Sequence, residues 1–196
     1  MSYSEFNAVI ELLDMLIFNW RTGSLFLLLI VAAVTDVRQH RIPNWLVMSG
    51  TVFGIFYNLY SPPFPHAGLI WPLEGLGMGF MVFFPMYLLR IMGAGDVKLM
   101  AMVGAFLGPV DMLWALLCTM IAGGVLSIFL VLARGTVRRM LNNIKTIFSL
   151  GYLSIASGMR PDVQLETATS AGKLPYGVAI ASGTMFYLVF HQLNLL

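Results

Sequence analysis

The chain has 196 residues, of which 59% are hydrophobic and 10% are charged, and its formal net charge is +2. Soluble domains are usually about 45–50% apolar, so this composition and the mean hydropathy of +0.84 exclude an ordinary soluble domain and predict an integral membrane protein. The small charge, with no basic cluster among aromatic residues, argues against nucleic acid as a partner, and the single cysteine excludes an internal disulfide or a thiolate metal site.

The N-terminal segment, residues 1–20, has apolar side chains at helical spacing from Glu5 to Trp20, which is typical of a short amphipathic helix on the membrane surface. Its early acidic residues have the wrong polarity for a secretory signal peptide. The later apolar runs lack the period-two alternation of strands, so we expect an all-α, polytopic membrane protein with about six transmembrane helices. The expected spans are residues 22–34 or 22–36, 45–60, 71–91, 96–107, 112–133 and 174–193.

Glycines recur within the third and fourth spans, at Gly75, Gly77 and Gly79 in the third and at Gly104 and Gly108 in the fourth. Small residues at this spacing let a neighbouring helix approach closely inside a membrane. We therefore expect both glycine-bearing faces to be contacts between helices.

Basic residues concentrate in two loops, 38–41 and 134–145, and the positive-inside rule assigns both loops to the cytoplasm. With six spans, two crossings separate Asp36 from Asp96, so both acids are expected at the cytoplasmic face. Asp111 and both chain ends then fall on the opposite face.

The chain has no internal repeat, so we expect residues 1–196 to form a single membrane-embedded domain. Residues 134–173 are expected to be a cytoplasmic loop. Within it, the apolar patch at 147–156 is too short to span a bilayer and is expected to lie along the interface.

The two acids at one membrane face, Asp36 and Asp96, require an explanation, because an aspartate near the bilayer interior costs roughly 2.5–3.5 kcal/mol. One explanation is that both are charges at the edges of loops, paired locally with basic neighbours and contributing little. The other is that two carboxylates held close cannot both ionise. One then keeps its proton while the other activates a water for attack on a peptide carbonyl, which is aspartic protease chemistry.

Three motifs carry a resemblance to a known family. Gly93-Ala94-Gly95-Asp96 matches the GxGD signature of intramembrane aspartic proteases, and Val97-Lys98-Leu99 continues it as in the second-aspartate motif of type IV prepilin peptidases. The stretch from Asp36 to Asn44 resembles the motif around the family's first aspartate, and the stretch from Lys173 to Ala179 resembles its C-terminal Pro-Tyr/Phe-Gly motif. The motifs follow the expected order over about 145 residues.

The resemblance implies that Asp36 and Asp96 form a catalytic dyad that alternates as general base and acid. It also implies a prepilin substrate, in which a basic leader joins an apolar helix, and which is cut at the cytoplasmic face of a bacterial inner membrane.

Within the family, the chain is most similar to the short peptidases of Flp-type tight-adherence pilus systems. Larger members of the family also methylate the new N-terminus of the pilin, and they carry a zinc-binding segment with paired cysteines. This segment has no counterpart here, so we expect no metal, no cofactor and no methyltransferase activity. The bilayer and the pilus assembly machinery are the other expected partners.

The remaining motif residues have two interpretations each. Gly93 and Gly95 either open the backbone to a substrate strand or form a plain loop. Lys98 either steadies a carboxylate or oxyanion or extends to the interface. Arg41 is a topology signal rather than a substrate contact.

Asn44 stands where larger family members often have an acid, and we expect it to cap the second span. Of the C-terminal motif, Pro175 and Gly177 begin the sixth span, and Tyr176 lies either near the dyad or in an interfacial aromatic belt.

Two other classes of function remain open from the residues alone. A small proton-coupled transporter would account for intramembrane acids, but it predicts polar residues across the bilayer depth that the spans do not supply. A non-catalytic assembly subunit of a secretion system would use the glycine faces and leave the two aspartates unexplained.

Overall fold

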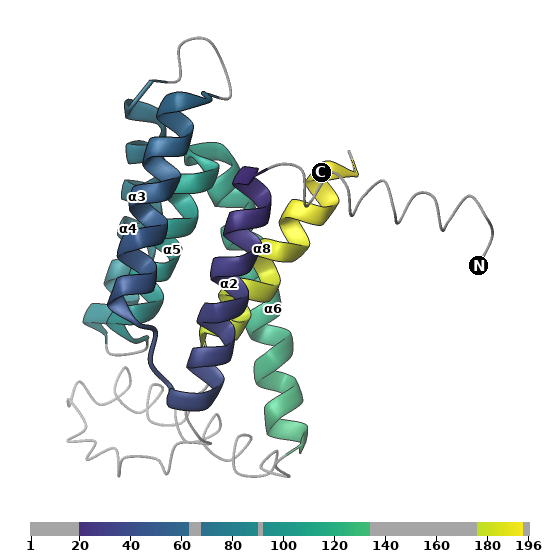
Figure 1. Ribbon diagram of the computed structural model, residues 1–196. Helices are drawn as coiled ribbons and strands as arrows, with labels where there is room; N and C mark the ends of the chain where they lie inside the picture. The colour runs from purple at the N-terminus through teal and green to yellow at the C-terminus, as the bar shows by residue number, and fades with distance from the viewer. Residues whose placement is uncertain (1–19, 63–67, 90–91, 134–175, 194–196) are drawn as a thin grey trace, which may run out of the picture. The chain divides into compact units, whose positions relative to one another are not determined.

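The computed structural model describes residues 20–62, 68–89, 92–133 and 176–193, and these form helices with no strand (Figure 1). The predicted amphipathic segment 1–20, the loop 134–173 and the patch 147–156 fall wholly or almost wholly outside the described residues. The described helices are α2 (Trp20–Gln39), α3 (Asn44–Tyr60), α4 (Ile70–Leu88), α5 (Ala94–Leu107), α6 (Pro109–Ala133) and α8 (Tyr176–Gln192).

The predicted all-helical class is confirmed, and each described helix overlaps one expected span. The prediction for the first span was too short, because α2 continues to Gln39. This extension places Asp36 within a helix rather than at the end of one. By length and composition α2 and α6 are able to cross a membrane, with mean hydropathies of 1.5 and 2.5.

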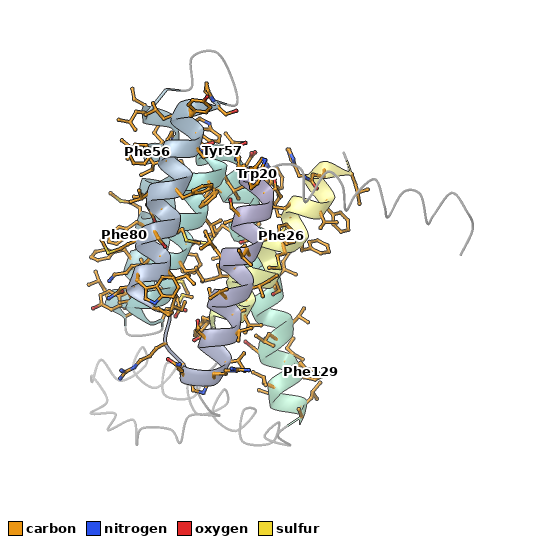
Figure 2. All side chains as sticks on the ribbon, in the orientation of Figure 1. Trp20, Phe26, Phe56, Tyr57, Phe80 and Phe129 are labelled. Carbon is orange, nitrogen blue, oxygen red and sulfur yellow. The ribbon has the colours of Figure 1, made fainter. Side chains whose placement is uncertain are left out.

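Large apolar side chains project outward from these helices (Figure 2). Phe56 on α3 is 66% exposed and Phe129 on α6 is 63% exposed. Soluble monomers rarely expose wide apolar surfaces, whereas a bilayer solvates them. The exposed faces therefore agree with a membrane location.

By its internal contacts the chain divides into two compact units, Met1–Gly123 with Pro175–Leu196, and Gly124–Leu174. Of the unit Gly124–Leu174, the structure describes the second half of α6. The site and the cavity both lie in the unit formed by Met1–Gly123 and Pro175–Leu196.

Helix α5 is the centre of its unit, because every residue from Leu99 to Leu107 is buried. Helix α4 packs against it at backbone distance. A Cβ atom at Gly75 would overlap the carbonyl oxygen of Gly104, and one at Gly79 would lie 2.5 Å from the carbonyl oxygen of Met100. The glycine pattern thus predicted this contact.

Gly77 was grouped with the contact glycines, but it takes no part in the packing. A Cβ atom there would meet nothing within 4 Å. Two residues along a helix turn a side chain to a different face, so Gly77 points away from the surface that Gly75 and Gly79 share.

The C-terminal end of α5 is closed by side chains from other helices. The buried Asn58 donates to the carbonyl oxygens of Ala105 and Phe106 at 2.8 and 3.2 Å, and Arg21 Nε donates to the carbonyl of Phe106 at 2.9 Å. The last carbonyls of a helix have no partner within it. These donors satisfy carbonyls at the end of α5 that the helix itself leaves unpaired.

Candidate active site

Asp36 lies near the C-terminal end of α2, and its side chain is buried, with 6% exposed. Helix α8 packs against α2 and begins at Tyr176. The backbone N–H of Gly177 donates to Asp36 Oδ2 at 2.8 Å. The first N–H groups of a helix lack partners within it, so an aspartate carboxylate at this end satisfies one of them and interacts favourably with the helix dipole.

The Gly177 position is tight against this carboxylate. A Cβ atom there would lie 2.8 Å from Asp36 Oδ2 and 3.0 Å from Asp36 Cβ. Glycine therefore allows α8 to approach Asp36 closely enough for its backbone to donate the hydrogen bond.

Asp96 lies in the first turn of α5 and is also buried, with 8% exposed. Its Oδ2 accepts a hydrogen bond from the N–H of Gly93 at 3.1 Å, and its own N–H donates to the carbonyl of Gly93 at 3.1 Å. Gly93 is the N-cap of the helix and has an extended backbone. This reciprocal pairing holds the carboxylate over the start of α5.

The two aspartates come from separate helices to the same end of the unit, and the charge of Asp36 acts on Asp96. Among the described residues, the hydrogen bonds of both carboxylates use Oδ2, which accepts a backbone N–H in each, and Oδ1 of each has none.

The connection between α2 and α3 also reaches this end. Ile42 is buried, and a Cβ atom at Gly95 would lie 3.3 Å from its Cβ. Gly95 thus lets this connection pack on the first turn of α5. The motifs that contain Asp36, Asp96 and Gly177 therefore converge in space, although 141 positions separate the outer two.

The structure corrects the prediction that Asn44 caps α3. The N-cap residue is Pro43, which makes no side-chain capping hydrogen bond, and Asn44 is the first helical residue. From that position the Asn44 side chain reaches the neighbouring helix, where its Oδ1 accepts a hydrogen bond from Lys98 Nζ at 3.1 Å. Lys98 is exposed and pairs with this amide.

Other predicted site residues lie at the edge of this region. Arg41 is exposed in the connection between α2 and α3, where His40 has a positive φ of 49°. Tyr176 is half-buried and packs against the apolar core. Pro175 lies outside the described residues.

Sequence reasoning missed two contacts at this site. One is the donation from Gly177 to Asp36, and the other is the packing of Ile42 on Gly95. The residues of both contacts belong to the three sequence motifs. Their proximity could therefore be predicted from the sequence, but the atoms that make contact could not. Among the described residues, no group of three or more His, Cys, Asp or Glu side chains could hold a metal ion.

The comparison with known families adds an independent observation. The sequence model of the type IV leader peptidase family matches residues 23–128, which include Asp36 and Asp96 and make up more than half of the chain. No curated protein and no solved structure matches the chain. This protein is therefore a membrane peptidase that belongs to the type IV leader peptidase family.

Proposed function

We propose that the protein is an aspartic endopeptidase that removes the basic leader from Flp-like prepilins, with Asp36 and Asp96 as its catalytic dyad. The observation that carries the proposal is the pair of buried carboxylates that α2 and α5 bring to the same end of the unit, each held by a backbone N–H. Its context supports the assignment, because both residues fall in the segment that matches a leader peptidase family.

In the proposed mechanism the two carboxyl groups act on one water, and one of them keeps its proton because two like charges at a shared site resist ionising together. The ionised partner takes a proton from a water, whose oxygen attacks the scissile carbonyl carbon. The protonated partner gives its proton to the carbonyl oxygen. The resulting diol collapses when a proton passes to the leaving nitrogen and the C–N bond breaks. No cofactor enters this sequence.

The start of α5 offers an approach for the substrate. Gly93 and Ala94 are exposed directly beside the buried Asp96, so an extended peptide can reach the carboxylate along a backbone that carries little side-chain bulk. The distribution of basic residues supports a multi-pass topology with this end at the cytoplasmic face, and the proposed membrane is the bacterial inner membrane. A prepilin presents its leader junction at that face.

The printed sequence has a single cysteine, so the zinc-binding segment with paired cysteines has no counterpart in it, which supports an Flp-type peptidase without methyltransferase activity. The mature pilin is therefore expected to carry an unmodified N-terminus. The mass of that N-terminus distinguishes this subclass from the larger family members that also methylate it.

The direct test is co-expression of an Flp-type prepilin with the wild type, Asp36→Asn or Asp96→Asn, followed by gel shift and mass analysis of the mature N-terminus. Asparagine keeps the size of the side chain but cannot take up the proton. We expect the wild type to cleave after the leader glycine and each variant to lose cleavage at unchanged membrane levels.

Glu74→Gln is the matched control, because it removes an exposed carboxylate near the start of α4, beside the C-terminal end of α5. We expect this variant to cleave like the wild type. Cleavage that persists in either asparagine variant would refute the dyad.

A further inference from the structure

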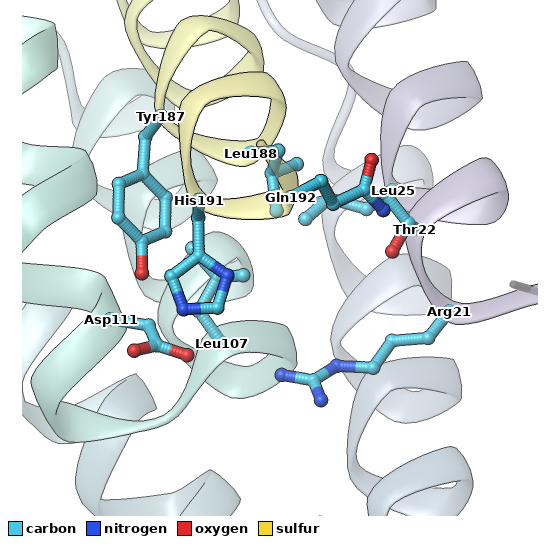
Figure 3. A pocket seen from close by; sticks show the side chains of 9 residues that line it. All are labelled: Arg21, Thr22, Leu25, Leu107, Asp111, Tyr187, Leu188, His191 and Gln192. Carbon is cyan, nitrogen blue, oxygen red and sulfur yellow. The ribbon is translucent and has the colours of Figure 1, made fainter. Parts of the chain in front are cut away.

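A cavity of about 170 Å³, lined by both polar and apolar side chains, is shown in Figure 3. It lies at the opposite end of the same helices from the aspartates. It is bordered by the start of α2, the end of α5, the start of α6 and the end of α8. Arg21 lies 15 residues before Asp36 in α2, which is about 22 Å along the helix axis. The proposed peptidase chemistry uses none of its polar residues, which are Arg21, Thr22, Asp111, Tyr187, His191 and Gln192.

The cation of the cavity, Arg21, is held in place by contacts outside it. Its Nε donates to the carbonyl of Phe106 at 2.9 Å, and its guanidinium carbon lies 5.2 Å from the centroid of the Trp71 ring. A guanidinium has five N–H donors, so the two Nη groups remain for a partner. In Figure 3 the guanidinium reaches toward the cavity from the α2 side.

The anion, Asp111, lies on the other side in the first turn of α6, where the helix dipole favours a negative charge. The Tyr187 hydroxyl points toward it and interacts with it electrostatically (Figure 3). Tyr187 is only 2% exposed. Within the described part of the chain, Gln192 Oε1 is buried without a hydrogen-bond partner.

The two opposite charges of the cavity therefore remain apart. Asp111 acts on Arg21 electrostatically, yet no direct ion pair joins them in the described residues. Opposite charges in a low-dielectric site attract strongly, and buried polar atoms without partners are costly. A molecule with an anionic group for Arg21 and a cationic group for Asp111 would satisfy both charges and the unpaired Oε1 of Gln192.

We propose that this cavity binds a zwitterion of that polarity, namely the phosphoethanolamine headgroup of a membrane phospholipid. The phosphate would accept from Arg21, and the ammonium would donate to Asp111 and Gln192 Oε1. The ends of helices in a membrane protein lie at headgroup depth, and the neighbouring Trp20 is 77% exposed, as expected for an interfacial aromatic anchor. The site does not depend on the proposed peptidase chemistry.

The test is titration of the delipidated full-length protein in detergent with phosphatidylethanolamine or phosphatidylglycerol, monitored by native mass spectrometry. Phosphatidylglycerol carries the phosphate but lacks the cationic group. We expect one phosphatidylethanolamine per chain, bound at least about tenfold more tightly than phosphatidylglycerol, because the ammonium makes charge-assisted hydrogen bonds. Glycerophosphoethanolamine binding alone as tightly as the lipid would instead identify a soluble zwitterion as the ligand and overturn the lipid assignment.

Asp111→Asn keeps the shape of the cavity and removes its anion. We expect it to raise the Kd for phosphatidylethanolamine about tenfold or more and to leave that for phosphatidylglycerol unchanged, whereas Arg21→Gln should weaken both. Glu74→Gln is the control for a lost surface carboxylate and should change neither Kd. If Arg21→Gln fails to fold, the Asp111→Asn result alone decides. Equal binding of the two lipids by the wild type, unaltered in Asp111→Asn, would overturn the proposal.

Discussion

Gly177→Ala tests whether the close approach of α8 to Asp36 supports the peptidase chemistry. The new Cβ atom would lie 2.8 Å from Asp36 Oδ2, whereas ordinary van der Waals contact begins at 3.4 Å, so the carboxylate or the helix must move by about 0.6 Å. Such a shift also strains the 2.8 Å hydrogen bond from the Gly177 N–H. A hydrogen bond to a charged group contributes about 1.5–3 kcal/mol, and misplacement of a catalytic group by about 1 Å can reduce a rate by about 100-fold.

We therefore expect Gly177→Ala to slow prepilin cleavage by about 10-fold to 100-fold, measured as initial rates in detergent at equal protein concentration. Thermal unfolding monitors the fold in parallel. Gly77→Ala is the matched control, because the same substitution there meets nothing within 4 Å, and alanine is favoured over glycine inside a helix by about 0.5–1 kcal/mol. It should cleave normally with an equal or higher Tm. Wild-type cleavage by Gly177→Ala would refute the reasoning.

Three further substitutions test the packing around the site. Gly75→Ala should lower the free energy of unfolding by about 3 kcal/mol, because its Cβ overlaps the backbone of Gly104; an unchanged Tm in detergent would contradict this contact. Asn58→Leu should lower the free energy of unfolding by about 1–3 kcal/mol, since it leaves the carbonyl of Ala105 without a donor and leaves that of Phe106 with Arg21 alone, and cleavage at permissive temperature should survive. Lys98→Met and Asn44→Ala remove the same exposed hydrogen bond, so both should reduce cleavage equally and by less than about fivefold. A larger loss in Lys98→Met alone would assign the ammonium a direct role in the reaction.

The arrangement of the candidate site was only partly predictable. Asn44 illustrates the limit, because a polar residue after a proline at the start of a helix is a reasonable cap by local rules. In the structure it instead pairs with Lys98, a residue 54 positions away on another helix. Local rules carry no information on which side chain of a distant helix will be within reach.

The amino-acid sequence by itself determined the helical class, the membrane location and the family, because apolar runs, glycine spacing and short motifs are local properties that need no partner. It also identified Gly75 and Gly79 as sites of close helix approach, since small residues signal such contacts in a membrane. Tertiary structure alone decided that Gly177 donates to Asp36 and that Arg21 and Asp111 face one cavity. These contacts depend on the packing of helices that are distant in the chain, and no local pattern encodes that packing.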